Sequence, residues 1–407
     1  MTEEIILRDY QTEIANKAVD KLKSLSIVYL ALEVRVGKTF TALEAAYLYG
    51  AKKVLFLTVK KAIGDISGDI DKFGKLDVEI LSIDSAHKAT GDYDLIIVDE
   101  AHGLGAFPKP SNRAKNVKKV VGSLPVILMS GTPHPESMSQ LFHQFWISDH
   151  SPFSSYTNFY KFAHEYVDIK QRVFNGRPAN DYSRGKEVMF TPVVDTYFLN
   201  FSQKQANFHC EVEEHIIDVK MQEDTMKMIR KIKRDKVLTM DSGVILAETP
   251  VKMMSKCHQL SSGTVILEET GMIIVDNTKA KYIEWYFKGK KIAIFYKYKA
   301  ELEMLKAIYG DNMTEDIVEF NETGKNIALQ IRSGSMGVNL SAADCQVFLN
   351  IDFSSKDYIQ SRARLQTQKR EKVDVYFLFS EGGIERDIYK SLQKKEDYTA
   401  RYYKQYF

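Results

Sequence analysis

One stretch near the start of the chain reads IVYLALEVRVGKT, residues 27–39, and apolar residues at helical spacing follow it. The apolar run 27–32 predicts a buried strand, and the residues after Gly37 predict a helix. A strand, a turn containing Val36-Gly37-Lys38-Thr39 and a helix are the setting of a phosphate-binding P-loop. We therefore expect backbone N–H groups at the helix start to bind phosphate, Lys38 to contact the β- and γ-phosphates, and Thr39 to bind Mg²⁺.

The P-loop pattern is incomplete, because Leu32 stands where the full pattern G-x-x-x-x-G-K-[ST] has its first glycine. An ordinary strand-to-helix turn would give the same half pattern. The choice between these interpretations depends on what the other strands of the domain carry.

Two acids follow the apolar run 95–98, in the order Asp99-Glu100-Ala101-His102. Ligands of open α/β sheets bind at the carboxyl ends of the strands, which is where this pair would lie. Asp99 is placed to hold Mg²⁺, and Glu100 is placed to orient or deprotonate an attacking water. A solvated acidic turn is the alternative, and the P-loop upstream argues against it.

Two more apolar runs complete the first α/β domain. Residues 53–58 end in Val59-Lys60-Lys61, and residues 125–129 end in Ser130-Gly131-Thr132-Pro133. Hydroxyl groups of the second segment can hydrogen-bond the acids of the neighbouring strand and relay the state of the phosphate. Taken alone, this segment is a common turn.

The last third of the chain predicts a second α/β domain. Apolar runs predict strands at 291–295, 326–331, 345–350 and 373–378, and helices over 299–309 and from about Gly383. The segment 332–340 carries two glycines and small polar residues, which let a backbone approach phosphates closely. A later helix places three polar residues on one face, since their spacings are four and three: Gln360, Arg364 and Thr367.

The middle of the chain, residues 151–250, has a weaker pattern. Residues 226–237 predict a basic helix, which is either a phosphate-contacting face or a solvated one, and residues 172–186 predict a loop or a hairpin. The aromatic residues favour a core over a base-stacking platform: Phe153, Tyr156, Phe159, Tyr160, Phe162 and Tyr166.

Composition favours a soluble, cytoplasmic chain. Its 407 residues indicate two to three domains, and its net charge of +2 means that any nucleic-acid affinity must come from local basic surface. Three widely spaced cysteines offer neither a disulfide framework nor a zinc pattern. The N-terminus has acids where a signal peptide needs bases, and no apolar run reaches the length of a membrane span.

In their order, these segments resemble the motifs of superfamily 2 helicases, and within them the Swi/Snf-type group of double-stranded-DNA translocases. Residues 7–11 resemble the opening motif, residues 33–39 the P-loop, with Arg35 where the group often has glycine, and residues 99–102 the DEAH box. Residues 129–142 resemble the third motif, and residues 258–281 resemble the lead-in to the second domain. Residues 332–344 resemble the fifth motif, residues 360–368 the sixth, and residues 375–385 the closing strand and helix. The resemblance spans nearly the whole chain, and its compact size resembles the small phage-encoded members.

The resemblance implies an α/β fold of two RecA-like parallel-sheet domains with a helical insertion between them. We expect the first domain at 1–150, the insertion and linker at 151–250, and the second domain at 251–407. It also implies ATP and Mg²⁺ as ligands, a DNA-dependent ATPase activity, and translocation on or remodelling of duplex or branched DNA, in preference to RNA. We expect a monomer that does not bind membranes.

Several residues acquire roles through the resemblance. Lys38, Thr39, Asp99 and Glu100 serve the reaction, with Thr39 and Asp99 holding Mg²⁺, and Arg364 acts from the second domain. Further residues are expected to bind the nucleotide: Arg8, Gln11, which reads adenine, Val36, Gly37, Gly337 and Gln360. Others are expected to contact nucleic acid: Thr58, Lys60, Lys61, Ser85, Ser333 and Asn339.

One departure concerns the sixth motif. The family has arginines four and seven residues after its glutamine, whereas this chain has Arg364 and then Thr367. The family's second arginine reaches the γ-phosphate, so its absence predicts weak hydrolysis unless Arg362 or Arg370 substitutes.

Three alternatives stay open. An RNA helicase is one, although the fifth motif argues against it. A nucleotide-gated DNA clamp with weak turnover is another, which Thr367 favours and the Asp99-Glu100 pair opposes. The third is a motor subunit whose aromatic tail, residues 398–407, docks on a partner protein; packing of this tail on its own domain is the favoured interpretation.

Overall fold

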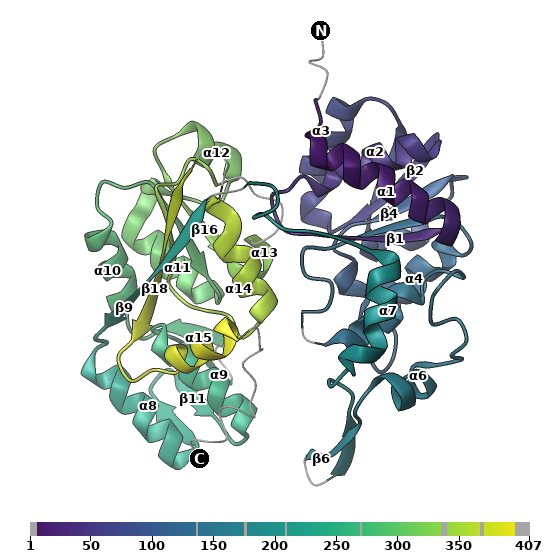
Figure 1. Ribbon diagram of the computed structural model, residues 1–407. Helices are drawn as coiled ribbons and strands as arrows, with labels where there is room; N and C mark the ends of the chain where they lie inside the picture. The colour runs from purple at the N-terminus through teal and green to yellow at the C-terminus, as the bar shows by residue number, and fades with distance from the viewer. Residues whose placement is uncertain are drawn as a thin grey trace. The chain divides into compact units, whose positions relative to one another are not determined.

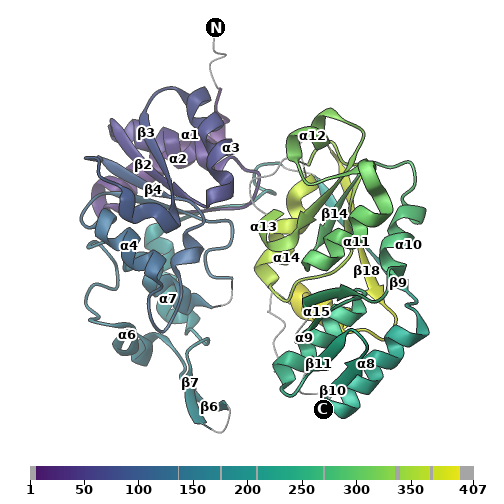
Figure 2. The same ribbon diagram turned by 180° about the vertical axis from the view of Figure 1, so that it is seen from behind.

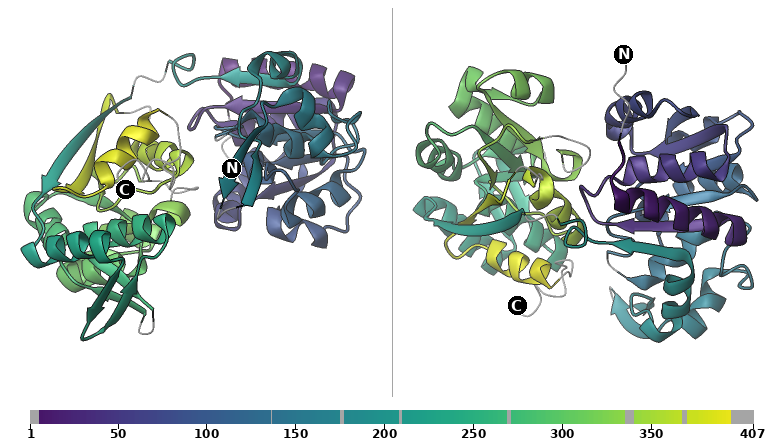
Figure 3. Two further views of the ribbon diagram at one scale, coloured as in Figure 1. Left: turned by 90° about the horizontal axis from the view of Figure 1, so that it is seen from below. Right: turned by 45° about the horizontal axis from the view of Figure 1, so that its top comes forward.

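The computed structural model describes residues 6–135, 137–174, 177–207, 210–268, 271–334, 340–366 and 370–394. The chain divides into two compact units, unit 1 (Met1–Phe208) and unit 2 (His209–Phe407). Each unit is built from one continuous half of the chain, coloured purple to teal in unit 1 and teal to yellow in unit 2 (Figure 3).

Unit 1 is built on a parallel sheet with the strand order β3-β2-β4-β5-β1-β8. The central strands are buried on both faces because helices cover both faces of the sheet (Figure 1). The strands are β1 (Ile27–Leu32), β2 (Lys53–Thr58), β3 (Asp77–Ser82), β4 (Leu95–Val98), β5 (Val126–Met129) and β8 (Phe198–Phe201).

The helices of unit 1 pack on the two faces of this sheet. Helices α1 to α3 bury residues such as Ile14, Ala46 and Ile66 on one face, and α4 to α7 bury Val117 and Phe162 on the other. The helices are α1 (Asp9–Leu25), α2 (Lys38–Tyr49), α3 (Ile63–Phe73), α4 (Asn112–Val121), α5 (Leu141–Phe145), α6 (Phe159–Tyr166) and α7 (Glu187–Tyr197). Short 3-10 turns lie at Lys60–Ala62, Ile83–Lys88, Ala101–Leu104 and Met138–Gln140.

The aromatic cluster of the middle segment belongs to the core of unit 1. Phe153, Phe159 and Phe162 are buried and pack around Phe142 at ring distances of 4.6–5.9 Å. The preference for a core at these positions is confirmed. The predicted loop or hairpin is an antiparallel hairpin, β6 (Lys170–Phe174) and β7 (Arg177–Asp181).

Unit 2 repeats the plan with a parallel sheet of order β15-β16-β14-β17-β18-β9 (Figure 2). Its strands are β9 (Glu211–Val219), β14 (Ile292–Tyr296), β15 (Met313–Thr314), β16 (Asn326–Gln330), β17 (Cys345–Phe348) and β18 (Lys372–Ser380). Two small antiparallel pairs accompany it: β10 (Val237–Met240) with β11 (Gly243–Leu246), and β12 (Thr264–Leu267) with β13 (Gly271–Ile274).

The helices of unit 2 include the predicted basic helix, which forms α8. They are α8 (Glu223–Asp235), α9 (Pro250–Ser261), α10 (Thr278–Tyr286), α11 (Lys299–Tyr309), α12 (Ile317–Glu322), α13 (Ile331–Gly334), α14 (Ser355–Arg362) and α15 (Glu385–Gln393). Two 3-10 turns lie at Gly310–Asn312 and Ala363–Leu365.

The boundary between the units differs from the expected one. Instead of forming an insertion of its own, the described part of 151–250 is divided between the units. Strand β8 pairs with β1 in the first sheet, and β9 pairs with β18 along nine residues of the second. Because each part of 151–250 pairs with a different sheet, the two parts belong to different units.

Two parallel six-stranded sheets flanked by helices confirm the expected pair of RecA-like domains. Among the described helices, none is both long enough and apolar enough to cross a bilayer. The aromatic tail at 398–407 lies outside the described residues.

A fully buried ion pair joins two helices of unit 2. Lys279 Nζ of α10 lies 2.7 Å from Glu385 Oε1 of α15, and neither side chain is exposed. Ser380 Oγ also donates to the Glu385 carboxylate, and a Cβ added at Gly383 would lie only 2.1 Å from Glu385 Oε2. The pair therefore fixes both partner helices and the glycine between them.

We predict that Glu385→Leu lowers the free energy of unfolding of unit 2 by about 3–5 kcal/mol, because it leaves the Lys279 ammonium buried without its partner. Urea unfolding, followed by the fluorescence of Trp285 in a Trp146→Phe background, measures it. The double variant Lys279→Met/Glu385→Leu is the control and should recover most of the loss. A single variant as stable as the parent would contradict the role of this pair.

Candidate functional site

The loop between β1 and α2 contains a glycine in the left-handed conformation, Gly37. Gly37 has a φ of 79° and is the N-cap of α2. The Nε2 of Gln11 donates to its carbonyl at 3.1 Å, and a Cβ added at Gly37 would lie 2.3 Å from that nitrogen. Both the left-handed conformation and the close approach of Gln11 therefore require glycine.

Helix α1 fastens this loop from its first turn. The Oε1 of Gln11 accepts from the backbone N–H of Arg8 at 3.0 Å, so both ends of the Gln11 amide are engaged. The Tyr10 hydroxyl donates to the Val36 carbonyl at 3.2 Å, and its ring stacks on Phe201 at 4.7 Å. Arg8, Gln11 and Val36, which we expected to bind nucleotide, are thus brought together.

A second set of contacts holds the loop from the end of β8. Gln203 Nε2 donates to the Val34 carbonyl at 2.9 Å, and the Gln203 N–H donates to the Glu33 carboxylate at 2.7 Å. Sequence reasoning missed this contact, because Gln203 lies far along the chain in a segment without a motif.

The Lys38 ammonium is bound to two carbonyl oxygens near the start of its own loop. Its Nζ donates to the carbonyls of Leu32 and Glu33, both at 3.2 Å, and a Cβ added at Gly131 would lie 3.6 Å from it. These acceptors are neutral, and an ammonium binds anionic oxygens more strongly. Thr39 follows in the first turn of α2, where helix N–H groups favour an anion.

The two acids lie at the carboxyl end of β4, as predicted. Thr58 Oγ1 donates to Asp99 Oδ2 at 3.0 Å. Burial and the charge of Glu100 raise the pKa of Asp99 to about 7, and the Lys38 ammonium offsets part of that rise. Burying two like charges is unfavourable unless a cation joins them. The residues therefore fit a divalent cation at Asp99, with Thr39 as a second oxygen donor from the loop.

Glu100 is held in a strained conformation. Its φ of 48° places a non-glycine residue in the left-handed region. Its Oε2 lies 3.1 Å from His102 Nδ1, which in turn lies 2.8 Å from Ser130 Oγ. Ser130 thus contacts the histidine of the acid motif, whereas we expected it at the acids.

A buried tyrosine extends the network of Glu100, His102 and Ser130, and it belongs to no sequence motif. Tyr29 of β1 donates through its hydroxyl to Gln144 Oε1 at 2.7 Å, and Gln144 Nε2 donates to the Pro133 carbonyl at 2.7 Å. Burial, and then the charge of Glu100, raise the pKa of Tyr29, which keeps the hydroxyl a donor. The segment 130–133 is therefore connected to the acid pair through His102 and to β1 through Gln144.

The residues of unit 1 that we expected to contact nucleic acid differ in how exposed they are. Lys60 and Lys61 are exposed in the turn after β2. Thr58 is fully buried and serves Asp99, so its hydroxyl is not presented to the surface that we expected. Ser85 is half-buried and its hydroxyl pairs with Ser82 Oγ at 2.9 Å.

In unit 2 the described residues cover only part of the expected set. Gln360 is buried, and its Oε1 has no hydrogen-bond partner within the described chain. Arg364 is half-buried in the turn Ala363–Leu365. Ser333 belongs to α13, whereas three others lie outside the described residues: Gly337, Asn339 and Thr367.

The two arginines considered as substitutes for Thr367 already have structural partners. Arg362 Nη1 lies 2.8 Å from Glu214 Oε1, next to the Tyr358 hydroxyl, which donates to the same carboxylate. Arg370 Nη2 donates to the carbonyls of Ser341 and Ala343 at 2.8 and 2.6 Å.

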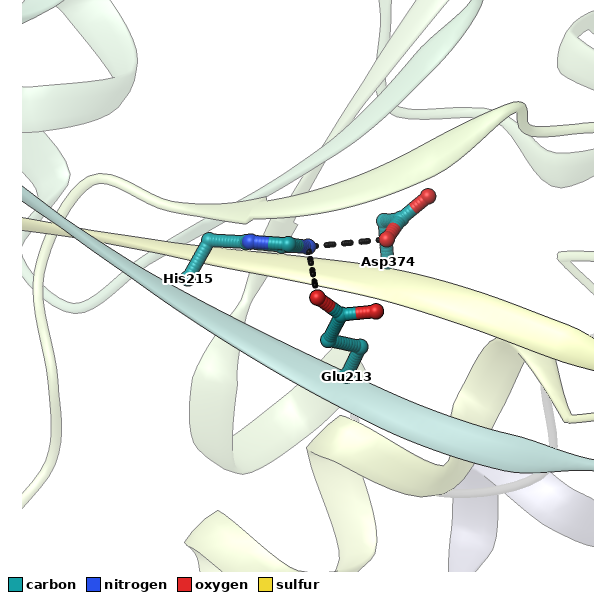
Figure 4. Close-up of side chains that lie close together, drawn as sticks. All are labelled: Glu213, His215 and Asp374. Carbon is teal, nitrogen blue, oxygen red and sulfur yellow. Dashed lines mark hydrogen bonds and ion pairs between the residues drawn. The ribbon is translucent and has the colours of Figure 1, made fainter.

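One group of metal-ligating side chains lies apart from this site, on β9 and β18 (Figure 4). His215 Nε2 lies 2.8 Å from Asp374 Oδ1 and 3.9 Å from Glu213 Oε1. The Lys372 ammonium pairs with both carboxylates and supplies their counter-charge. The group is therefore an ion-pair network on the sheet.

We predict that Asp99→Asn stabilises unit 1 at pH 8, on the order of 4 kcal/mol, because it removes a buried carboxylate whose pKa is raised on folding to about 7. The protonated carboxyl contributes stability that is fully present below about pH 4 and is lost as the pH rises through about 7. The gain in the variant should therefore shrink towards pH 4. Urea unfolding at several pH values, followed by Trp146 fluorescence in a Trp285→Phe background, measures it.

Asp94→Asn is the matched control. The backbone N–H groups of Lys53 and Lys52 lower the pKa of Asp94, so this variant should lose stability near neutral pH. Equal pH profiles for both variants would contradict the burial of an ionisable Asp99.

Comparison with known proteins gives partial matches. No family model matches the chain. It is 29 % identical over 93 residues to human chromodomain-helicase-DNA-binding protein 1, covering 22 % of this chain and 5 % of that protein. It is 24 % identical over 334 residues to a SWI/SNF-related matrix-associated actin-dependent regulator of chromatin, subfamily A-like protein 1 homolog, of Caenorhabditis elegans, covering 75 % of this chain and 45 % of that one. The chain thus spans less than half the length of these curated relatives.

Solved structures match more loosely. The Sulfolobus solfataricus SWI2/SNF2 ATPase core in complex with dsDNA is 15 % identical, with a TM-score of 0.42 and coverage of 97 % of this chain and 92 % of that one. The Sulfolobus solfataricus SWI2/SNF2 ATPase core domain is 16 % identical, with a TM-score of 0.43, and the match covers 97 % of this chain and 90 % of that one. The sequence relatives confirm the resemblance to the Swi/Snf-type group of superfamily 2.

Proposed function

We propose that this chain is an ATP-dependent DNA translocase or helicase of the Swi/Snf type, which couples ATP hydrolysis to movement on, or remodelling of, duplex or branched DNA. One observation carries the proposal. The Gly37 loop, the Lys38 ammonium and the half-buried acid pair Asp99 and Glu100 meet at the carboxyl edge of one parallel sheet. That combination suits phosphoryl transfer, in which positioning and charge do most of the catalysis.

The roles follow from the contacts. Lys38 would exchange its two carbonyl partners for β- and γ-phosphate oxygens. Thr39 and Asp99 would hold Mg²⁺, which supplies positive charge next to the phosphates when bound. Arg8 and Gln11 lie beside the loop, where the adenine is expected.

Glu100 is the residue that we assign to the attacking water. Its backbone lies in the left-handed region directly after the strand, and its carboxylate would accept the proton of the water. His102 and Ser130 would transmit this change of charge to the segment 130–133, since they link it to Glu100.

DNA contacts are assigned to groups whose chemistry favours phosphates over base edges. Lys60 and Lys61 are exposed and near each other in sequence, and Ser85, Ser333 and Asn339 are the polar candidates. Phosphate binding of this kind weakens with salt and varies little with sequence. The choice of DNA over RNA is supported by the human relative, whose name describes a DNA-binding helicase.

A nucleotide-gated DNA clamp with weak turnover is the second candidate. It is favoured by the engagement of Arg362 with Glu214 and of Arg370 with two carbonyls, because neither arginine is then available to replace the residue missing at Thr367. The chain acts as a monomer in both proposals.

The experiment that tests the proposed function is ATP turnover measured alone and with single-stranded DNA, duplex DNA, branched DNA and RNA. We expect the largest stimulation from duplex or branched DNA. Stimulation by RNA alone would favour the RNA helicase, and binding of DNA without stimulation would favour the clamp.

We predict that Lys38→Ala abolishes turnover, whereas Glu100→Gln keeps ATP affinity and lowers turnover by several orders of magnitude, since its role is in the chemical step. Steady-state turnover and equilibrium binding of a fluorescent ATP analogue separate the two effects. Lys52→Ala, a surface lysine on the same unit, is the control and should match the parent. If Glu100→Gln lost binding and turnover together, its role would be structural.

We predict that Thr367→Arg raises turnover at saturating DNA with little change in ATP affinity. An arginine that stabilises charge on the transferring phosphoryl group is worth about 10³–10⁵ in rate in GTPases, and a partial gain is expected here. Arg362→Ala should lower the stability of unit 2, through Glu214, more than it lowers turnover per folded molecule. No gain from Thr367→Arg, together with loss of turnover in folded Arg370→Ala, would show that Arg370 already serves the phosphate.

A further inference from the structure

An aromatic patch lies on the surface of unit 2. It is defined by Tyr282, Trp285 and Tyr286 of α10 and by Tyr376 of β18. Trp285 is 67 % exposed and is the most exposed aromatic side chain among the described residues. The Tyr282 ring lies 5.5 Å from the Trp285 ring and 5.6 Å from the Tyr286 ring, the latter nearly parallel at 15°. The helix packs beside α11 and β9 on the surface of unit 2 (Figures 1 and 2).

The patch is anchored to the sheet. Tyr376 of β18 lies 6.3 Å from Tyr286, and His215 stacks on Tyr376 at 4.6 Å. Asp374 holds the His215 ring through its Nε2 (Figure 4). The rings are therefore pre-positioned, which lowers the entropy lost when a flat ligand binds.

Exposed lysines lie on α10 and directly after it. Lys281 precedes Trp285 by one helical turn, and Lys288 and Lys290 follow the helix; all three are exposed. None of the three forms an ion pair within the part of the chain that the structure describes. A hollow of about 430 Å³ opens beside the end of α10 and is lined by Lys288 and Lys290.

Two carboxylates also line this hollow, but the lysines in its lining outnumber them. Asp344 already accepts from the N–H of Lys291 at 2.7 Å, and Glu284 is a single charge among the lysines. The wall thus offers ammonium groups for an anion of phosphate size next to stacked rings.

We propose that the aromatic patch and its lysines bind a single-stranded DNA segment, with bases stacked on Trp285 and phosphates on Lys281, Lys288 and Lys290. Aromatic rings accept any base, and lysines follow a phosphate backbone. Ala280 and Ile283 of α10 are buried in the core, so the exposed face of the helix offers rings and ammonium groups. Trp and Tyr also anchor protein interfaces, but the lysines beside these rings favour an anionic partner. The choice of DNA rests on the proposed function, and the patch lies outside the residues assigned to it.

The chain contains only two tryptophans, which makes the test direct. Trp146→Phe leaves Trp285 as the single indole reporter. Titration with oligo(dT) at low salt should quench its fluorescence, with the midpoint matching the anisotropy of labelled oligo(dT). Duplex DNA of the same length should quench it less, because paired bases are not available for stacking.

Variants separate stacking from charge. Trp285→Ala should weaken oligo(dT) binding at least about fivefold, and the triple variant Lys281→Glu/Lys288→Glu/Lys290→Glu should weaken it further and reduce its salt dependence. The matched control, Lys220→Glu/Lys231→Glu/Lys233→Glu, makes the same charge change on and beside α8 and should weaken binding less. Circular dichroism verifies that each variant folds.

Unchanged Trp285 fluorescence at saturating oligo(dT), or equal losses in the patch and control variants, would overturn the proposal. Stimulation of ATP turnover by duplex DNA distinguishes this failure from failure of the proposed function. If that stimulation persists in Trp285→Ala while Trp285 does not respond to oligo(dT), only the patch is excluded.

Discussion

The site in unit 1 depends on two carboxylates placed side by side at the end of a buried strand. Asp99 and Glu100 repel each other, and burial makes that repulsion stronger than it would be in water. The Thr58 hydroxyl, the Lys38 ammonium and the His102 ring each relieve part of it. A dication would relieve more, so the energetic cost of the pair without a ligand becomes affinity for a ligand that brings positive charge.

Side-chain hydrogen bonds hold the loops that surround this pair. The P-loop is fastened by Gln11 from one end of the unit and by Gln203 from the end of β8. The segment 130–133 is tied to the acids through His102 and Ser130, and to β1 through Gln144. These contacts connect Glu100 to a loop outside the acid pair, which is what the proposed coupling of hydrolysis to movement would require.

Much of the fold and of the central site could be predicted from the sequence, because buried parallel strands are continuous apolar runs. The strands ending at Leu32, Thr58 and Val98 and the acids after the last of them lie where the pattern placed them. The edge strands β8 and β9 could not be found in this way, since β9 reads EVEEHIIDV, with acids spread through it, and only its pairing with β18 identifies it. The sequence pattern between residues 151 and 250 therefore predicts neither edge strand.

Contacts made by residues far apart in sequence were also out of reach. Thr58 was expected at a surface, but its hydroxyl meets Asp99 because β2 and β4 are neighbours in the sheet. Tyr29 and Gln144 have no motif, and Gln203 lies far from the loop that it holds. The contact between the rings of α10 and Tyr376 of β18 also joins residues that are far apart in sequence.

The central claim is that this chain uses ATP to move along duplex DNA, and displacement of a triplex-forming third strand tests it most directly. A labelled third strand on a duplex should be released by the unmodified chain with ATP. It should stay bound without ATP and with a Glu100→Gln variant. Release that needs no ATP, or efficient ATP hydrolysis on the same duplex without any release, would contradict the account.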